Sequence, residues 1–152
     1  MTLLSLDQAQ AIVAGVLAES RKLNLEPITV SVLDASGTLK AMAREDGSSL
    51  LRPDLAFSKA WGAIGMGLPS RELNRRSEIM PAFFNALNSV SQGRVVPMAG
   101  GVLILSGETV VGSVGVSGDT SDNDELAAIA GIKAAGFTAD FEATPQVRKS
   151  QF

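Results

Sequence analysis

The sequence contains no cysteine, no histidine and no tyrosine. Without cysteine, the chain has no disulfides, no thiolate nucleophile and no cysteine-based zinc site. Without histidine, it has no Ser-His-Asp triad and no imidazole group for acid–base chemistry. Any chemistry that this chain performs must therefore use carboxylates, lysine, arginine, hydroxyls or backbone groups.

Charged residues and long apolar runs are also scarce. Charged residues make up 19% of the chain and hydrophobic residues 45%, which excludes disorder over most of its length. The longest mostly apolar run, 95–105, is broken by Pro97 and two glycines and is too short for a membrane span of about 20 residues. The N-terminus lacks the basic and apolar regions of a signal peptide. We expect one cytoplasmic domain over residues 1–137, followed by a tail over 138–152 that is either partly disordered or an arm on a neighbouring subunit.

The charges are distributed unevenly along the chain. Residues 40–76 carry seven basic and four acidic side chains, whereas residues 108–142 carry seven acidic side chains and Lys133 as the one basic side chain. The net charge of −3 argues against nucleic acid as the main partner. The two blocks are either solvated faces, or a basic region that meets a small anion or the acidic end of a neighbouring subunit.

Periodicity and turn signals predict an α+β fold with helices packed on a sheet. Ser5 and Gln8 form a capping-box pattern, and the turn 34–37 ends in Gly37 and predicts a hairpin. The expected helices are 6–23, 53–65, 70–76, 81–90 and 121–136, and the expected strands are 28–32, 38–44, 95–98, 102–106 and 109–116. In the helix 81–90, we expect Phe83, Phe84, Leu87 and Val90 to be buried.

Two glycine-containing stretches are candidates for a ligand site. Gly100 and Gly101 would let the backbone approach a ligand closely, or they form a bulge or tight bend between strand segments. Residues 112–124 place three glycines before a helix, but their spacing matches neither the dinucleotide-binding pattern nor a phosphate-binding loop. The acids of this second stretch complement the helix dipole, and they form a weak pattern for a divalent cation; we predict no metal site.

The predicted helix 53–65 carries the candidates for chemistry. Lys59 lies among alanines, where burial could depress its pKa and make it a base or a Schiff-base nucleophile. The structural alternative is a lysine that reaches to solvent or forms a salt bridge between subunits. Asp54 is a second candidate acid–base group on the same helix.

These stretches together resemble a known family. Residues 34–39, 44–47, 56–60, 100–102 and 111–118, with Asp122 and Asp124, are similar to the GlcG/HbpS family of haem-degrading or haem-binding domains, which includes the C-terminal domain of PduO-type corrinoid adenosyltransferases. The resemblance covers about residues 5–137. It implies a profilin- or PAS-like antiparallel sheet of about five strands with helices on both faces, and it implies a homo-oligomer.

The resemblance also implies ligands: haem, a corrinoid or a small organic acid. Of the usual side chains that ligate haem iron, this chain has only methionine. The candidates are Met42, Met66, Met80 and Met98, although a methionine more often fills a core. A small acid would instead pair with arginine side chains.

Three functions remain open on these grounds. The first is a small-ligand-binding module with an accessory or sensor role in metabolism. The second is a metal-independent isomerase, hydrolase or lyase acting on a small carboxylate, and the third is a scaffold whose assembly is its function. We expect no nucleic-acid or membrane partner. The candidate catalytic residues are Lys59 and Asp54, and the candidate ligand-binding residues are Arg52, Trp61, Arg71, Arg94, Gly100, Gly101 and Ser117.

Overall fold

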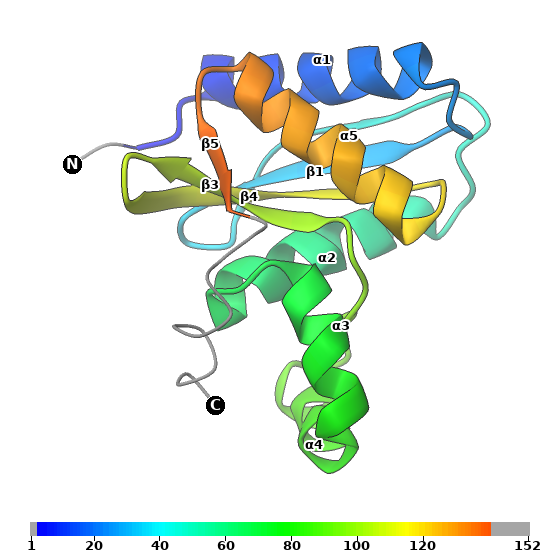
Figure 1. Ribbon diagram of the computed structural model, residues 1–152, viewed down its shortest axis with the longest axis vertical. Helices are drawn as coiled ribbons and strands as arrows, with labels where there is room; N and C mark the ends of the chain where they lie inside the picture. The colour runs from blue at the N-terminus through cyan, green and yellow to red at the C-terminus, as the bar shows by residue number, and fades with distance from the viewer. Residues whose placement is uncertain (1–2, 141–152) are drawn as a thin grey trace.

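A five-stranded antiparallel sheet forms the centre of the protein, as a computed structural model of residues 3–140 describes it (Figure 1). The strands follow the order β2-β1-β4-β3-β5 across the sheet. The elements in chain order are α1 (Leu6–Lys22), β1 (Thr29–Asp34), β2 (Leu39–Arg44), α2 (Arg52–Met66), α3 (Ser70–Ile79), α4 (Pro81–Val90), β3 (Gly101–Ser106), β4 (Thr109–Ser117), α5 (Ser121–Ala134) and β5 (Thr138–Asp140). The predicted α+β class, with about five strands and helices on both faces, is confirmed.

One face of the sheet carries the larger apolar core. Its β-branched side chains, such as Val30, Val32 and Val114, alternate with smaller residues along the strands and pack beneath α1 and α5. The two helices approach each other closely at Gly131 of α5. A Cβ there would lie 2.8 Å from the Ile12 carbonyl oxygen of α1. On this face, apolar side chains of α1, α5 and the sheet pack against one another.

The opposite face of the sheet is covered by α2, and its residues in β4 are small. Ser113 and Gly115 of β4 lie directly under this helix, and the Ser113 hydroxyl donates a 2.8 Å hydrogen bond to the Ala60 carbonyl. A Cβ at Gly115 would overlap the Ala56 carbonyl oxygen and lie 2.8 Å from the Ala60 nitrogen. The backbone of α2 therefore rests almost on the backbone of the sheet.

Several local predictions are confirmed. Ser5 and Gln8 form a capping box at α1, with hydrogen bonds of 2.9 and 3.1 Å between the side chain of each residue and the backbone of the other. Gly37 takes a φ of 78° in the hairpin turn. For α5 the sequence predicts Thr120 or Ser121 as the cap, and Thr120 is the residue that caps it, by accepting from the Asn123 nitrogen.

The connection before β3 differs from the prediction. The sequence predicts a strand over 95–98, but these residues have no regular structure. Pro97 has no N–H to give to a strand ladder, and Val95 packs instead against α2, 3.5 Å from where a Cβ of Gly62 would lie. The fifth strand is β5, whose three residues lie beyond the domain boundary predicted at 137 and pair with β3. The rest of the predicted tail, 141–152, lies outside the described residues.

The helices α3 and α4 form an arm that projects away from the sheet on the α2 side (Figure 1). The prediction that α4 buries Phe83, Phe84, Leu87 and Val90 is wrong. None of the residues of α4 is buried, and Val90 is 79% exposed. Amphipathic periodicity shows that one side of a helix is apolar, but it does not show what covers that side.

Candidate functional site

The structure divides the nine predicted site residues among separate places. Arg52, Lys59, Gly100, Gly101 and Ser117 meet where α2 crosses the ends of β3 and β4. Trp61 and Arg94 contact each other on the outer side of α2. Arg71 lies on α3, and Asp54 is exposed in the first turn of α2.

Lys59 is enclosed at the centre of the first group, with 3% of its surface exposed. Its Nζ donates to the Val116 carbonyl at 3.0 Å and to Asp124 Oδ2 at 3.2 Å. Burial lowers the pKa of Lys59, and burial raises the pKa of Asp124, while the attraction between the two groups opposes both shifts. The depressed lysine pKa expected from the sequence is present, but the amine faces a carboxylate and a carbonyl inside the protein. Its predicted catalytic role with the exposed Asp54 stays a prediction.

The two glycines where β3 begins leave room for Lys59 to pack against them. Gly100 has a φ of 125°, and a Cβ there would lie 2.9 Å from the lysine Cδ. A Cβ at Gly101 would overlap the Lys59 carbonyl oxygen. These contacts give the glycine pair a structural purpose, which matches the alternative of a tight bend. Their predicted role in ligand binding stays a prediction.

Ser70 holds the first residue of β3 against the start of α3. The sequence predicts that Ser70 caps α3, but its hydroxyl instead accepts from the Gly101 nitrogen at 2.7 Å and donates to the Gly101 oxygen at 3.3 Å. We expect Ser70→Ala to lower the free energy of unfolding by about 1–3 kcal/mol, because it leaves a buried N–H without its acceptor. Urea unfolding measures this loss. The surface variant Ser36→Ala should leave the urea midpoint unchanged, and an equal loss in both variants would contradict the assignment.

Arg52 and Ser117, two of the predicted ligand-binding residues, contact each other. Arg52 Nη1 donates to the Ser117 hydroxyl at 3.0 Å. Within residues 3–140, no carboxylate lies within ion-pair distance of Arg52. Repulsion from this guanidinium is one of the smaller causes that lower the pKa of Lys59. Ligand binding by Arg52 and Ser117 stays a prediction.

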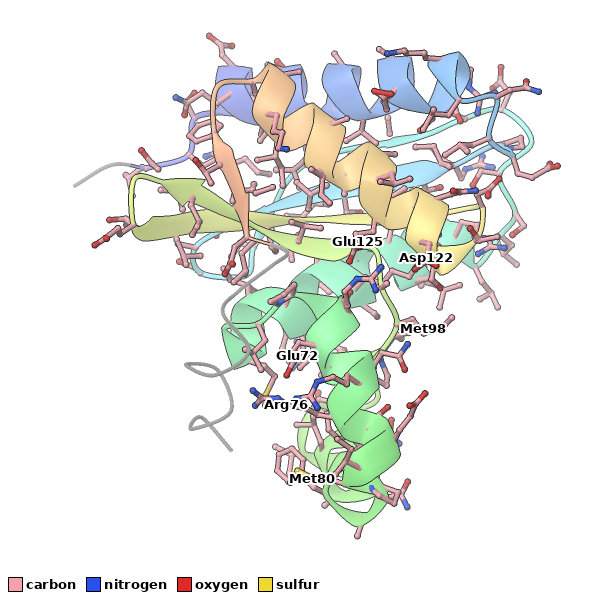
Figure 2. The ribbon with its side chains drawn as sticks, viewed as in Figure 1. Glu72, Arg76, Met80, Met98, Asp122 and Glu125 are labelled. Carbon is pink, nitrogen blue, oxygen red and sulfur yellow. The ribbon has the colours of Figure 1, made fainter. Side chains whose placement is uncertain are left out.

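The acidic start of α5 pairs with basic residues of its own chain. Arg71 of α3 contacts Glu125 at 2.7 Å and Asp122 at 2.9 Å, and Figure 2 shows these two acids side by side on α5. The sequence pattern predicts that the acids complement the helix dipole, and it does not identify Asp124 and Glu125 as the partners of Lys59 and Arg71. The one feature of the sequence that pointed to these pairs is the opposite charge of residues 40–76 and 108–142. The ion pairs of Arg71 connect the first turn of α3, where the arm begins, to α5.

Trp61 lies in an apolar slot between α2 and α4. The slot has a volume of 220 Å³ and is lined by Trp61, Gly62, Gly65, Met66, Leu87, Val90, Ser91 and Val95. The Arg94 guanidinium carbon sits 4.0 Å from the centroid of the Trp61 ring. Nothing lies within 4 Å of a Cβ built at Gly65, so this glycine widens the slot. The slot combines an aromatic wall with one cation at its edge.

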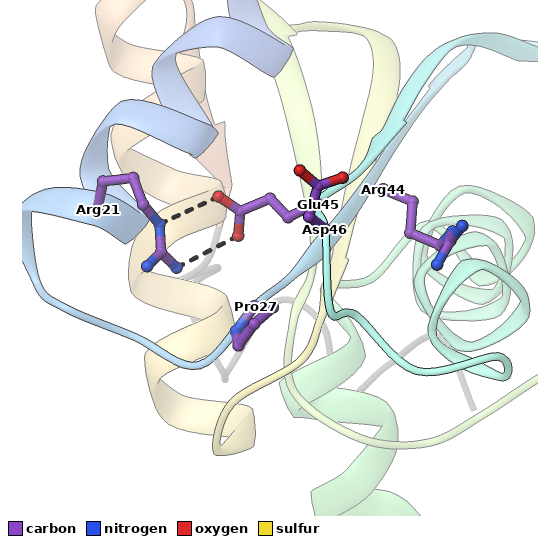
Figure 3. Close-up of a pocket in the computed structure, with 5 residues that line it drawn as sticks. All are labelled: Arg21, Pro27, Arg44, Glu45 and Asp46. Atoms are coloured by element: carbon purple, nitrogen blue, oxygen red, sulfur yellow. Dashed lines mark hydrogen bonds and ion pairs between the residues drawn. The ribbon is translucent and has the colours of Figure 1, made fainter.

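A second hollow gives a weaker candidate. A larger surface hollow of 460 Å³ is lined by Arg21, Arg44 and Glu45 (Figure 3). Two of its charged residues are already engaged with each other, since Arg21 pairs with Glu45 at 3.0 Å. Among residues 3–140, no three histidine, cysteine, aspartate or glutamate side chains gather so as to hold a metal ion. The described helices also include none with the length and apolarity needed to cross a membrane.

An enclosed haem does not fit the slot formed by the described residues. Met66 is the one candidate iron ligand that lines the slot, whereas Met98 is 46% exposed on the connection before β3 (Figure 2). The volume of 220 Å³ lies below the range of about 300–1,000 Å³ for pockets that enclose drug-sized ligands. The slot has room for a single substituted ring.

Comparisons with known proteins agree on one family. The family model described as "Haem degrading protein HbpS-like" matches residues 4–133. Corrinoid adenosyltransferase PduO of Citrobacter freundii is 33% identical over 99 residues, which cover 64% of this chain and 29% of that protein. The chain thus matches less than a third of that relative's length. A 15.0 kDa protein of the dhaT-dhaS intergenic region of Citrobacter freundii is 29% identical over 126 residues, covering 82% of this chain and 87% of that protein.

Solved structures share the fold over nearly the whole domain. The crystal structure of a PduOC–haem complex has a TM-score of 0.80 and 28% identity, and covers 90% of this chain and 97% of that one. The crystal structure of HbpS has a TM-score of 0.79 and 26% identity, and covers 90% and 92% of the two chains. The α3–α4 arm and the sheet therefore belong to one shared architecture.

Proposed function

The chain belongs to the family of haem-degrading, HbpS-like proteins, and from that premise we propose that it binds a small planar acid in the slot between α2 and α4. The observation that carries this proposal is the Arg94 guanidinium 4.0 Å over the Trp61 ring at the edge of an apolar slot. An aromatic or unsaturated ring would lie against the apolar walls. Its carboxylate would pair with Arg94.

This ligand class is favoured over haem and corrinoids by the chemistry of the slot. A single thioether, Met66, offers little to a haem iron, and the slot is too small for a macrocycle. Because the family is described by haem degradation, tetrapyrroles are the alternative ligands to test. The proposal includes a homo-oligomer of these chains in the cytoplasm, and the exposure of the apolar helix α4 supports the oligomer.

Fluorescence of Trp61, the one tryptophan of the chain, gives a direct test. We expect benzoate, used as the probe, to change this fluorescence in a saturable way. Arg94→Gln should weaken benzoate binding by about tenfold or more, because it removes a charge-assisted hydrogen bond worth about 1.5–3 kcal/mol. The matched control is Lys40→Gln on the exposed strand β2, which should bind benzoate as the unchanged protein does.

A parallel titration with haemin separates the two ligand classes. A Soret shift that saturates at one haem per chain, with no response of Trp61 to benzoate, would overturn the small acid in favour of a tetrapyrrole. If Arg94→Gln and Lys40→Gln lose equal affinity, Arg94 does not hold the carboxylate. If neither probe changes the fluorescence or the Soret band, the slot is not the binding site.

A further inference from the structure

The slot between α2 and α4 contains a buried serine in addition to the arginine at its edge. Ser91 follows the last residue of α4 and takes its C-cap position. It lines the slot and is 4% exposed. The other described residues that line the slot are glycines or have apolar or aromatic side chains, so Ser91 carries the one hydroxyl among them. A hydroxyl buried in apolar surroundings is costly unless it is well hydrogen-bonded.

The hydrogen bond that the Ser91 hydroxyl makes inside the protein is long. The hydroxyl donates to the Asn88 carbonyl oxygen at 3.4 Å, whereas O–H···O bonds usually measure about 2.5–3.0 Å. The Asn88 oxygen already accepts from the Gly93 nitrogen at 2.7 Å, in the turn that ends α4. The turn therefore does not depend on the serine hydroxyl. The hydroxyl can rotate toward a closer acceptor, and its oxygen can itself accept a hydrogen bond.

The backbone of the same serine orients the cation of the slot. Arg94 Nε donates to the Ser91 carbonyl oxygen at 3.0 Å, and the Arg94 backbone nitrogen donates to the same oxygen at 3.2 Å. With Nε engaged in this way, the guanidinium has its two terminal nitrogens left to meet a carboxylate end-on. Ser91 thus holds the cation through its carbonyl and offers its hydroxyl within the same turn.

Trp61 supplies a wall of the slot with its ring face. A Cβ built at Gly37 would lie 3.6 Å from both Cδ1 and Nε1 of the indole, so the N–H edge of the ring faces the turn between β1 and β2. A ligand ring in the slot would therefore meet the indole as an apolar surface. The polar contacts that the slot offers to such a ligand are those of Ser91 and Arg94.

We propose that the slot selects a hydroxy-substituted aromatic acid, whose carboxylate binds Arg94 and whose ring hydroxyl forms a hydrogen bond with the Ser91 hydroxyl. This inference rests on the proposed function and adds to it a residue that sets specificity. A ring hydroxyl both donates and accepts, so it can satisfy Ser91 better than the 3.4 Å contact with Asn88 does. An unsubstituted ring leaves Ser91 with that contact alone. One neutral hydrogen bond gives a gain in affinity of about threefold to tenfold.

Isothermal titration calorimetry of the full chain with benzoate, 3-hydroxybenzoate and 4-hydroxybenzoate tests the selection. We expect at least one of the two hydroxybenzoates to bind about threefold to tenfold more tightly than benzoate. The fluorobenzoate with fluorine at the same ring position should bind as benzoate does, because fluorine cannot donate a hydrogen bond. If neither hydroxybenzoate binds more tightly than benzoate, or if the fluorobenzoate gains as much affinity, the proposed selection is wrong.

The variant Ser91→Ala assigns the preference to the serine hydroxyl. It should reduce the ratio of the hydroxybenzoate and benzoate affinities to about one. The matched control Ser89→Ala changes an exposed serine of α4 outside the slot and should keep the ratio. Arg94→Gln should weaken both acids by a similar factor and leave the ratio unchanged, because the carboxylate contact is common to them. A Ser91→Ala protein that keeps the ratio overturns the assignment, and so does an equal loss in Ser89→Ala.

The same titrations separate this inference from the proposed function. Benzoate binding that depends on Arg94 but shows no preference for a ring hydroxyl would overturn the selection by Ser91 and leave the proposed function standing. The absence of binding by all of these acids would overturn both. If circular dichroism shows that Ser91→Ala does not fold, the comparison of hydroxybenzoate with fluorobenzoate in the unchanged protein still decides the question.

Discussion

Replacing Lys59 by methionine is expected to lower the free energy of unfolding by about 3–5 kcal/mol. The substitution leaves Asp124 buried, with 1% of its surface exposed, and removes its positive partner at 3.2 Å. Breaking one half of a buried ion pair leaves an uncompensated charge in a poorly polarisable interior. Burial already raises the pKa of Asp124, and the attraction of Lys59 opposes that shift. The substitution removes this attraction, so the ionised form of Asp124 becomes less stable in the folded protein. Urea unfolding measures the change.

Two further variants separate the charge effect from simple loss of packing. Lys22→Met makes the same substitution at a lysine whose side chain is 78% exposed, and it should change stability by less than about 1 kcal/mol. The double variant Lys59→Met with Asp124→Asn removes both charges and keeps an oxygen to accept from the Asp119 nitrogen. It should be more stable than Lys59→Met alone. A double variant as unstable as the single one would mean that the ion pair is not the source of the loss.

Gly115→Ala is expected to cost about 3 kcal/mol of stability. The new methyl group would overlap the Ala56 carbonyl oxygen and approach the Ala60 nitrogen at 2.8 Å. Both are backbone atoms, so the whole of α2 must move away from β4, at the upper end of the usual cost of overpacking. Such a shift would also strain the hydrogen bond from Ser113 to Ala60. Thermal and urea unfolding would report the loss together.

The chain offers a matched glycine for this experiment. Gly65 lies on the outer side of α2, where a Cβ would meet nothing within 4 Å. Gly65→Ala should raise stability by about 0.5–1 kcal/mol, because alanine favours a helix interior. Opposite signs for the two changes would confirm that contact between β4 and α2, and not the loss of a glycine as such, decides the outcome at Gly115. An unchanged urea midpoint in Gly115→Ala would show that α2 packs less closely than described.

Local patterns in the sequence predicted the local features of the fold. The capping box at Ser5 and the positive φ at Gly37 depend on residues within four positions, and both are present. The strand predicted at 95–98 is absent because an apolar run does not reveal whether its partner is a strand or a helix. The strand β5 was missed since three residues are too few to show a period of two.

The candidate site was predicted less well, because its contacts connect distant parts of the chain. The buried pair of Lys59 and Asp124 joins residues 65 positions apart, and a sequence pattern holds no record of such a pairing. Trp61 and Arg94 were both named as candidates, but only the fold brings them into contact beside α4. The exposure of α4 could not be predicted from periodicity, since it depends on how the arm stands away from the sheet (Figure 1).

The order of the strands also bears on how the chain reaches its folded state. The adjacent pair β1 and β4 joins the two hairpins at the middle of the sheet, and in it Thr29 near the start of the chain faces Ser117. The inner edge of the β1–β2 hairpin is therefore paired only after β4 has been made and has reached β1. Contacts between such distant residues slow folding, because a long loop must close before they form. On a ribosome, the N-terminal half of this protein emerges with the centre of its sheet still missing.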